Sequence, residues 1–168
     1  MNKVYLISGP CGCGKSTLAK EMAGLIDHSF LIVGDDLHGF FSEKDDVTWE
    51  ETLKITWENI SSITQNALRN HLNVIIDYVV EDELQQLINA LVEFDYELKY
   101  MVLVPSESSI QNRITTRGDV ELIERGLFLR KKLIETEINI PYLYDNSNKS
   151  IQEEIEDILH DPRFIYKV

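Results

Sequence analysis

The feature that most constrains this chain is a short segment near its start, Gly9-Pro-Cys-Gly-Cys-Gly14-Lys15-Ser16, which follows the pattern G-x-x-x-x-G-K-[ST]. An apolar run at residues 4–7 precedes it, and a helical pattern at residues 16–24 follows it. Strand, glycine-rich loop and helix, in that order, is the setting that a phosphate-binding loop requires. The start of the chain is therefore predicted to be a βα unit whose loop wraps a phosphate chain.

The residue types of this loop suit that chemistry. Glycines let backbone N–H groups turn inward around a polyphosphate, and the helix N-terminus adds donors and its positive dipole end. Lys15 is expected to bring its ammonium group to the β- and γ-phosphates, and the Ser16 hydroxyl to ligate Mg²⁺. Thr17 falls in the first helical turn, within reach of the α-phosphate. In this part of the chain, nucleotide binding is assigned to Gly9, Cys11, Gly12, Cys13, Gly14, Lys15, Ser16 and Thr17.

Length and composition predict a globular protein with a single domain, residues 1–168. No apolar run reaches the length of a membrane span, and 43% of the residues are hydrophobic. The chain enters a strand directly, so a cytoplasmic protein without a secretory signal is expected. The net charge of −13 opposes binding to nucleic acid and to anionic membranes. This charge also opposes the binding of a nucleoside triphosphate, so the site is expected to rely on Mg²⁺ and on a locally positive loop.

Strand and helix patterns alternate along the chain, as is typical of an α/β fold. Strands are predicted at residues 3–8, 30–33, 73–77, 98–104 and 142–145, and helices at residues 15–26, 48–70, 81–93, 106–116, 120–139 and 150–160. This alternation favours right-handed crossovers and a parallel sheet with helices on both faces. Ligands of such sheets bind beyond the carboxyl ends of the strands, so acids at those ends are candidates for chemistry.

Two predicted strands end in acids. Asp35 and Asp36 follow the strand at residues 30–33. Phosphoryl transfer to a hydroxyl needs a carboxylate that orients the hydroxyl and accepts its proton, and Asp35 is preferred for this role, with Asp36 second. The alternative is a pair of helix N-cap residues. Asp77 ends the run Val74-Ile-Ile-Asp77, a Walker-B-like pattern whose carboxylate holds Mg²⁺ directly or through water. A turn residue or a substrate contact are the alternatives for Asp77.

Phosphoryl transfer also needs cations at the transferring group. Arginines occur at positions 113, 117, 125 and 130, around Gly118. Because Gly118 separates two helical patterns, residues 113–130 are predicted to form a lid that excludes water. Arg113 and Arg117 are preferred as catalytic residues, and surface ion pairs are the alternative. Asn146, beyond the last strand, is predicted to contact the base of the nucleotide, although a turn or a helix cap explains it equally well.

Together these motifs resemble the P-loop small-molecule kinases, the group that includes gluconate kinase, shikimate kinase and chloramphenicol phosphotransferase-like enzymes. The resemblance extends over essentially the whole chain. It implies a three-layer α/β/α fold with a parallel five-stranded sheet of order 2-3-1-4-5 and a small helical lid. The segment Gly34-Asp35-x-Leu37-His38 is similar to a gluconate kinase segment whose Asp is a substrate-side acid. The segment Asp45-Asp-Val-Thr-Trp49 keeps acids and a Trp of those enzymes, but it lacks the Arg that a sugar acid needs.

These features predict an ATP- and Mg²⁺-dependent kinase that phosphorylates a hydroxyl of a small metabolite or antibiotic. Gluconate kinase proper, a nucleoside or nucleotide kinase, and a nucleotide-binding regulatory ATPase are the alternatives. A monomer or homodimer is expected. The sequence leaves open both the acceptor and the preference for ATP over GTP.

Overall fold

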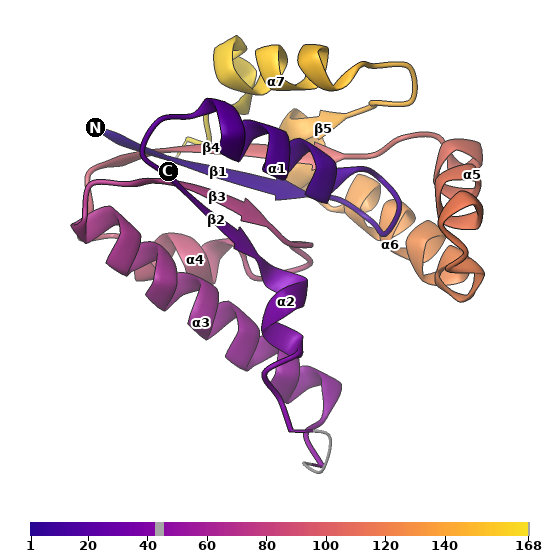
Figure 1. Cartoon of the computed structure of the whole chain (residues 1–168), viewed down its shortest axis with the longest axis horizontal. Coiled ribbons are helices and arrows are strands. Elements are labelled where there is room, and N and C mark those ends of the chain that lie inside the picture. Colours follow the sequence, from indigo (N-terminus) through magenta and orange to yellow (C-terminus); the bar gives the residue numbers. More distant parts are fainter. Residues whose placement is uncertain (43–45, 168) are drawn as a thin grey trace.

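The centre of the molecule is a parallel sheet (Figure 1), seen in a computed structural model that describes residues 1–42 and 46–167. Its five strands lie in the order β2-β3-β1-β4-β5, and each pair of neighbours is parallel. The strands are β1 Asn2–Ser8, β2 Ser29–Val33, β3 Asn73–Asp77, β4 Tyr96–Leu103 and β5 Leu143–Tyr144. The predicted α/β class and strand order are thus confirmed.

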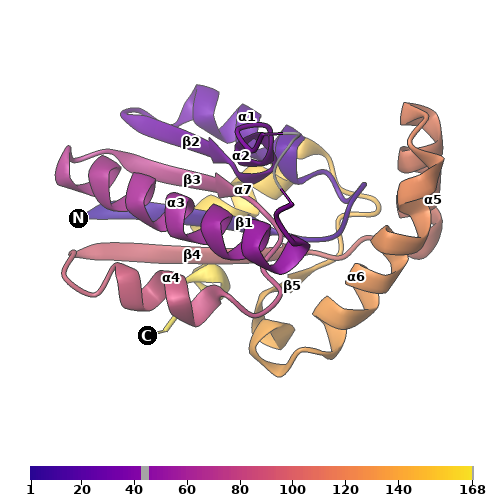
Figure 2. The ribbon, with the colours of Figure 1, turned by 90° about the horizontal axis from the view of Figure 1, so that it is seen from below.

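Helices cover both faces of this sheet. They are α1 Lys15–Leu25, α2 Gly34–His38, α3 Trp49–Arg69, α4 Leu84–Ala90, α5 Glu107–Arg117, α6 Ile123–Glu135 and α7 Ile151–His160. Helices α1 and α7 lie on one face, and α3 and α4 lie on the other (Figure 1). Helices α5 and α6 lie beyond the ends toward which the strand arrows point (Figure 2). None of the helices within the described residues combines the length and the apolar character that a membrane span requires.

Alternate residues of the central strand enter two separate cores, because side chains of a strand point to opposite faces in turn. Val4 and Leu6 of β1 are fully buried on the side of α3 and α4. Tyr5 and Ile7 are buried on the side of α1 and α7. Trp57 of the long helix α3 is 0% exposed, as expected of a residue that packs this helix onto the sheet. Because both faces are covered, the central residues of β1 and β3 are apolar on both sides of the sheet.

The predicted helix at residues 120–139 is wrong in its extent, since α6 ends at Glu135. Asn139 explains this end, because its buried Nδ2 donates to the carbonyl of Leu133 at 3.1 Å. Its Oδ1 accepts from the hydroxyl of Tyr100 at 2.8 Å. A carbonyl in the last helical turn thus receives its hydrogen bond from a side chain that is anchored to β4. Pro141 lies in the 3-10 segment that follows.

Helix α4 is also shorter than the predicted range of residues 81–93. The carboxylate of Glu83 accepts hydrogen bonds from the N–H groups of Glu81 at 2.9 Å and Asp82 at 3.0 Å. This local turn keeps the latter two residues out of the helix and leaves their side chains available for other contacts. The last strand, predicted at residues 142–145, is likewise shortened to the two residues that pair with β4.

Candidate active site

The parallel register brings three groups to one edge of the sheet. Asp77 at the end of β3 pairs with Ile7 of β1 on one side and with Val33 of β2 on the other. Strand β1 leads directly into the glycine-rich loop, and β2 leads into α2 and Asp35. The register therefore places Asp77 between the loop and Asp35, at the edge where ligands of parallel sheets bind.

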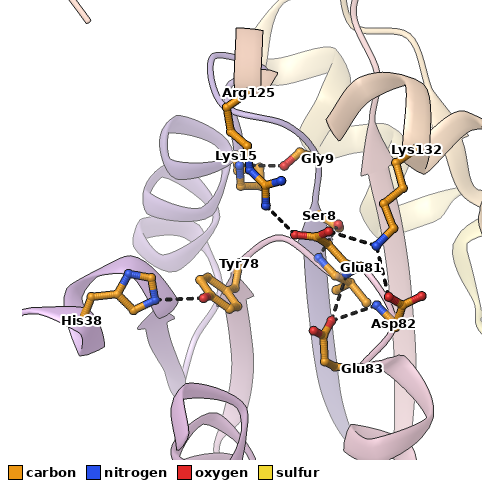
Figure 3. A network of polar contacts seen from close by, with 11 residues as sticks. Ser8, Gly9, Lys15, His38, Tyr78, Glu81, Asp82, Glu83, Arg125 and Lys132 are labelled. Atoms are coloured by element: carbon orange, nitrogen blue, oxygen red, sulfur yellow. Dashed lines mark hydrogen bonds and ion pairs between the residues drawn. The ribbon is translucent and has the colours of Figure 1, made fainter. Parts of the chain in front are cut away.

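The loop has the conformation that a phosphate cradle needs. Gly12 and Gly14 have φ angles of 78° and 105°, in the left-handed region that favours glycine. The ammonium group of Lys15 donates to the carbonyls of Gly9 at 2.9 Å and Pro10 at 3.2 Å (Figure 3). Lys15 thus folds back over the loop, and its charge lies where the phosphates of a nucleotide would be cradled. These residues fit a nucleoside polyphosphate.

The two cysteines of the loop have different surroundings. Cys13 is 0% exposed, and burial raises the pKa of its thiol. Cys11 is partly exposed. Gly126 packs tightly beside it, because a Cβ on this glycine would lie 3.2 Å from the carbonyl oxygen of Cys11. Helix α6 therefore begins directly against the loop.

Ser16 and Asp77 form the pair expected of a Mg²⁺ site. The Ser16 hydroxyl is close enough to the carboxylate of Asp77 to lower the pKa of that group, and Asp77 is 3% exposed. Burial raises the pKa of Asp77, although the Lys15 charge and the Ser16 hydroxyl act in the opposite direction. Mg²⁺ prefers oxygen ligands and keeps several waters. In the described part of the chain no three His, Cys, Asp or Glu side chains gather into a metal site, so Mg²⁺ here would take its remaining ligands from phosphate and water.

The structure separates the two acids that follow β2. Asp35 is close enough to Lys15, Asp77 and Tyr78 for its charge to act on all three groups. Asp36 instead lines a cavity of about 600 Å³ between β2 and α3. The geometry therefore supports the preference for Asp35 as the acid that faces the loop.

An aromatic cluster borders this acid. The Nε2 atom of His38 lies 2.9 Å from the hydroxyl of Tyr78 (Figure 3). The ring of His38 also meets the ring of Trp49 edge-on, with 5.5 Å between the centroids. Trp49 is 54% exposed, so its ring is open to a ligand. The acid at Asp45, noted in the sequence beside this Trp, lies outside the described residues.

Gly34, between β2 and Asp35, is in close contact with the ring of Tyr78. A Cβ at this position would lie 2.3 Å from two ring atoms, which is too close for any Cβ. Gly34→Ala is therefore expected to displace Tyr78 from His38 and to lower the free energy of unfolding by about 1–3 kcal/mol. Urea denaturation measures the change. Gly39→Ala is the control, because its Cβ would meet no atom closer than 3.4 Å; equal losses for both variants would contradict the expectation.

The arginines of the predicted lid have different partners. Arg113 donates to the carbonyl of Cys13 at 2.8 Å and to that of Asn146 at 3.3 Å, so it points behind the loop. Arg117 pairs with Asp119 at 3.3 Å, and its side chain is 53% exposed. These contacts therefore do not favour the predicted role of Arg113 and Arg117 at the transferring phosphoryl group.

Arg125 of α6 occupies a different position. It donates to Glu81 at 2.7 Å, and Lys132 binds the second carboxylate oxygen of Glu81 at 3.0 Å. Figure 3 shows this network in the same view as Lys15 and Gly9. Arg130, in contrast, binds a main-chain carbonyl at the end of β4. Arg125 is thus the lid arginine that reaches the loop after β3.

A cavity of about 580 Å³ opens beside the loop, between α5 and the start of α7. Thr17 lines it, as expected of a residue near the α-phosphate. Asn146 also lines it, but its Nδ2 donates to the carbonyl of Cys13 at 2.9 Å and to Oε1 of Glu154 at 3.1 Å. The cavity is suited to the base and ribose of a nucleotide. The amide nitrogen of Asn146, however, is already hydrogen-bonded to the loop.

Sequence reasoning missed Tyr78, Glu81 and Glu154. A signal for Glu154 was available, because it lies with Ile151 and Ile155 on the apolar stripe of α7, where a carboxylate needs a buried partner. No local pattern marks the other two. The partners of Glu81 on α6 lie 44 and 51 residues away in the sequence, so only the fold brings them together.

Comparison with known proteins agrees with this fold. A family model, AAA_33, described as an AAA domain, matches residues 4–126. No curated protein matches the chain. Among solved structures, the tunicamycin resistance protein of Deinococcus radiodurans is similar, with 14% identity, a TM-score of 0.68 and coverage of 94% of each chain.

Two further solved structures share the fold. A gluconokinase from Sinorhizobium meliloti 1021 is 19% identical, with a TM-score of 0.64 and coverage of 94% of this chain and 89% of that one. A chain of the Pnkp1/Rnl/Hen1 RNA repair complex is 19% identical, with a TM-score of 0.58 and coverage of 78% of this chain and 46% of that one. These likenesses confirm the expected P-loop kinase fold.

Proposed function

Because the chain belongs to the AAA_33 family of AAA domains, we propose that it is an ATP- and Mg²⁺-dependent kinase of a small hydroxylated molecule. The observation that supports this most is the meeting of three groups at one edge of the sheet. They are the loop with Lys15, the pair Ser16 and Asp77, and the carboxylate of Asp35. Together they offer a cation for the phosphates, oxygen ligands for Mg²⁺ and a base for the hydroxyl.

In this mechanism the loop amides and Lys15 hold the β- and γ-phosphates. Ser16 and Asp77 would hold Mg²⁺, which would offset phosphate charge. Asp35 orients the acceptor hydroxyl and accepts its proton as the oxygen attacks the γ-phosphorus. The bond between the γ-phosphorus and the bridging oxygen breaks, and ADP leaves with that oxygen.

We assign the cation at the transferring group to Arg125 in place of Arg113 and Arg117. The guanidinium of Arg113 is engaged at a main-chain carbonyl, and Arg117 lines the cavity that we assign to the base. Arg125 is held by Glu81, which follows β3 and its Asp77 by four positions in the sequence. We infer that a cation at this place lies near the developing charge, where it contributes most.

The surroundings of Asp35 favour a neutral or positively charged acceptor. Burial raises the pKa of Tyr78, and the carboxylates of Asp35, Glu83 and Glu81 raise it further, so three acids act on one hydroxyl. Within the described residues, the two cations of α6 near them, Arg125 and Lys132, are already paired with Glu81. A sugar acid or a phosphorylated acceptor would be repelled. A neutral sugar, a nucleoside or an amino sugar would fit, with its ring against the exposed Trp49.

A screen of ADP release over acceptors tests this proposal. The panel compares neutral sugars, nucleosides and aminoglycoside-like antibiotics with gluconate and shikimate. We expect release that depends on a neutral or amino-bearing acceptor. ADP release that no acceptor stimulates would favour a regulatory ATPase. ADP release stimulated by gluconate alone would favour a gluconate kinase.

A kinase that acts on RNA ends is the second candidate, because the fold is shared with a chain of an RNA repair complex. The net charge of −13 weighs against a polyanionic acceptor. Adding 5′-hydroxyl oligonucleotides to the same panel distinguishes the two candidates, and we expect no stimulation by them.

A further inference from the structure

A cluster of two buried side chains and one half-buried arginine lies behind the phosphate loop, outside the groups assigned to phosphoryl transfer. The carbonyl of Cys13 accepts hydrogen bonds from Arg113 Nη1 at 2.8 Å and from Asn146 Nδ2 at 2.9 Å. Asn146 Nδ2 also donates to Glu154 Oε1 at 3.1 Å. Asn146 is 1% exposed and Glu154 is 3% exposed. Arg113, Asn146 and Glu154 are called the loop brace below.

The loop brace holds one peptide plane of the loop. The carbonyl of Cys13 and the N–H of Gly14 belong to the same trans peptide, so they point in opposite directions. Two donors keep the carbonyl on the side of the brace. The N–H of Gly14 is therefore turned to the other side, where it can join the amides that cradle phosphate. A Cβ on Gly14 would lie 3.6 Å from Asn146 Nδ2, at van der Waals distance, so the brace is adjacent to this peptide.

We propose that Arg113 and Asn146 are positioning residues that act on the donor nucleotide through the carbonyl of Cys13. Glu154 in turn holds the amide of Asn146. The loop brace fixes this peptide before the ligand binds, so the loop does not need to rearrange on binding. This preorganisation raises the affinity for the phosphate chain. This inference rests on the proposed function, since it takes the loop as the site of the phosphates.

Direct reading of the base is the rival role for the same side chains. All three residues of the loop brace also line the cavity assigned to the base. Asn146 and Glu154 each keep one buried oxygen without a hydrogen-bond partner among the described residues. A residue that reads the base matters only for ligands that carry a base. A residue that holds the loop matters for any phosphate chain.

Titration calorimetry with two ligands, ATP·Mg²⁺ and inorganic tripolyphosphate·Mg²⁺, separates the two roles. Asn146→Asp keeps the shape of the side chain but replaces the donor that faces the carbonyl of Cys13. We expect both affinities to fall by a similar factor, at least about tenfold, because a buried carbonyl then faces an oxygen. Asn148→Asp is the matched control, since it adds the same charge two positions away on the same loop at an exposed residue. Both affinities of this control should stay close to those of the parent protein.

A loss confined to ATP would assign Asn146 to the base and overturn the proposal, and so would unchanged affinity for both ligands. Arg113→Lys decides the question if Asn146→Asp does not fold, as judged by its thermal midpoint. Lysine keeps the charge but not the fork of donors, so an equal loss for both ligands again supports a held peptide. A parent protein that binds neither ligand would instead overturn the proposed function itself.

Discussion

Replacing Lys15 by alanine is expected to weaken the binding of ATP·Mg²⁺ by about 100-fold or more and to abolish phosphoryl transfer. The ammonium group folds over the loop and bonds to the carbonyls of Gly9 and Pro10, so it has a preset position above the cradle. There it meets the β- and γ-phosphates, and the loss of one such preorganised donor lowers turnover by about 100- to 1,000-fold. Titration calorimetry of ATP·Mg²⁺ against the parent and variant proteins measures the effect on binding.

Lys54→Ala is a suitable control for this experiment. Its side chain is 72% exposed on α3, and its ion pair is with Glu58 of the same helix. This variant should bind ATP·Mg²⁺ as the parent does. If Lys15→Ala also bound ATP·Mg²⁺ with the affinity of the parent, the loop could not be the phosphate site.

Asp35→Asn is expected to lower acceptor-dependent transfer by about 100- to 10,000-fold, the range that a general base contributes. Its affinity for ATP·Mg²⁺ should change little, because the amide still fits and the contacts of Lys15 with the loop remain. The loss would appear in the turnover number, since the amide cannot accept the proton of the hydroxyl. Rates of ADP release at saturating acceptor, together with calorimetry of ATP·Mg²⁺, measure the two effects separately.

The neighbouring acid offers a matched control for that variant. Asp36 lines the cavity between β2 and α3, away from the loop. Asp36→Asn should therefore keep most of the transfer activity. Full activity in Asp35→Asn combined with its loss in Asp36→Asn would reverse the assignment of the two acids.

The elements that sequence reasoning predicted well are those with local signals. A strand followed by Gly9–Ser16 and a helix predicts the phosphate loop, and the alternation of patterns predicts the parallel sheet and its carboxyl edge. The edge position of Asp77 then follows from the strand that it ends.

What the sequence could not predict depends on contacts between distant segments. Asp35 and Asp36 are adjacent in α2, and consecutive helical residues point about 100° apart, so only the packed helix shows which one faces the loop. The place of Arg113 depends on a carbonyl 100 residues away. The end of α6 likewise depends on Asn139, whose hydroxyl partner lies 39 residues away.

Phosphorus NMR of a complete reaction tests most directly whether this protein moves a phosphoryl group from ATP to a hydroxyl. With an acceptor that stimulates ADP release, the γ-phosphate resonance should disappear while a phosphomonoester resonance grows by an equal amount. If inorganic phosphate appeared instead, and no acceptor of the panel yielded an ester, the protein would be a hydrolase and not a kinase.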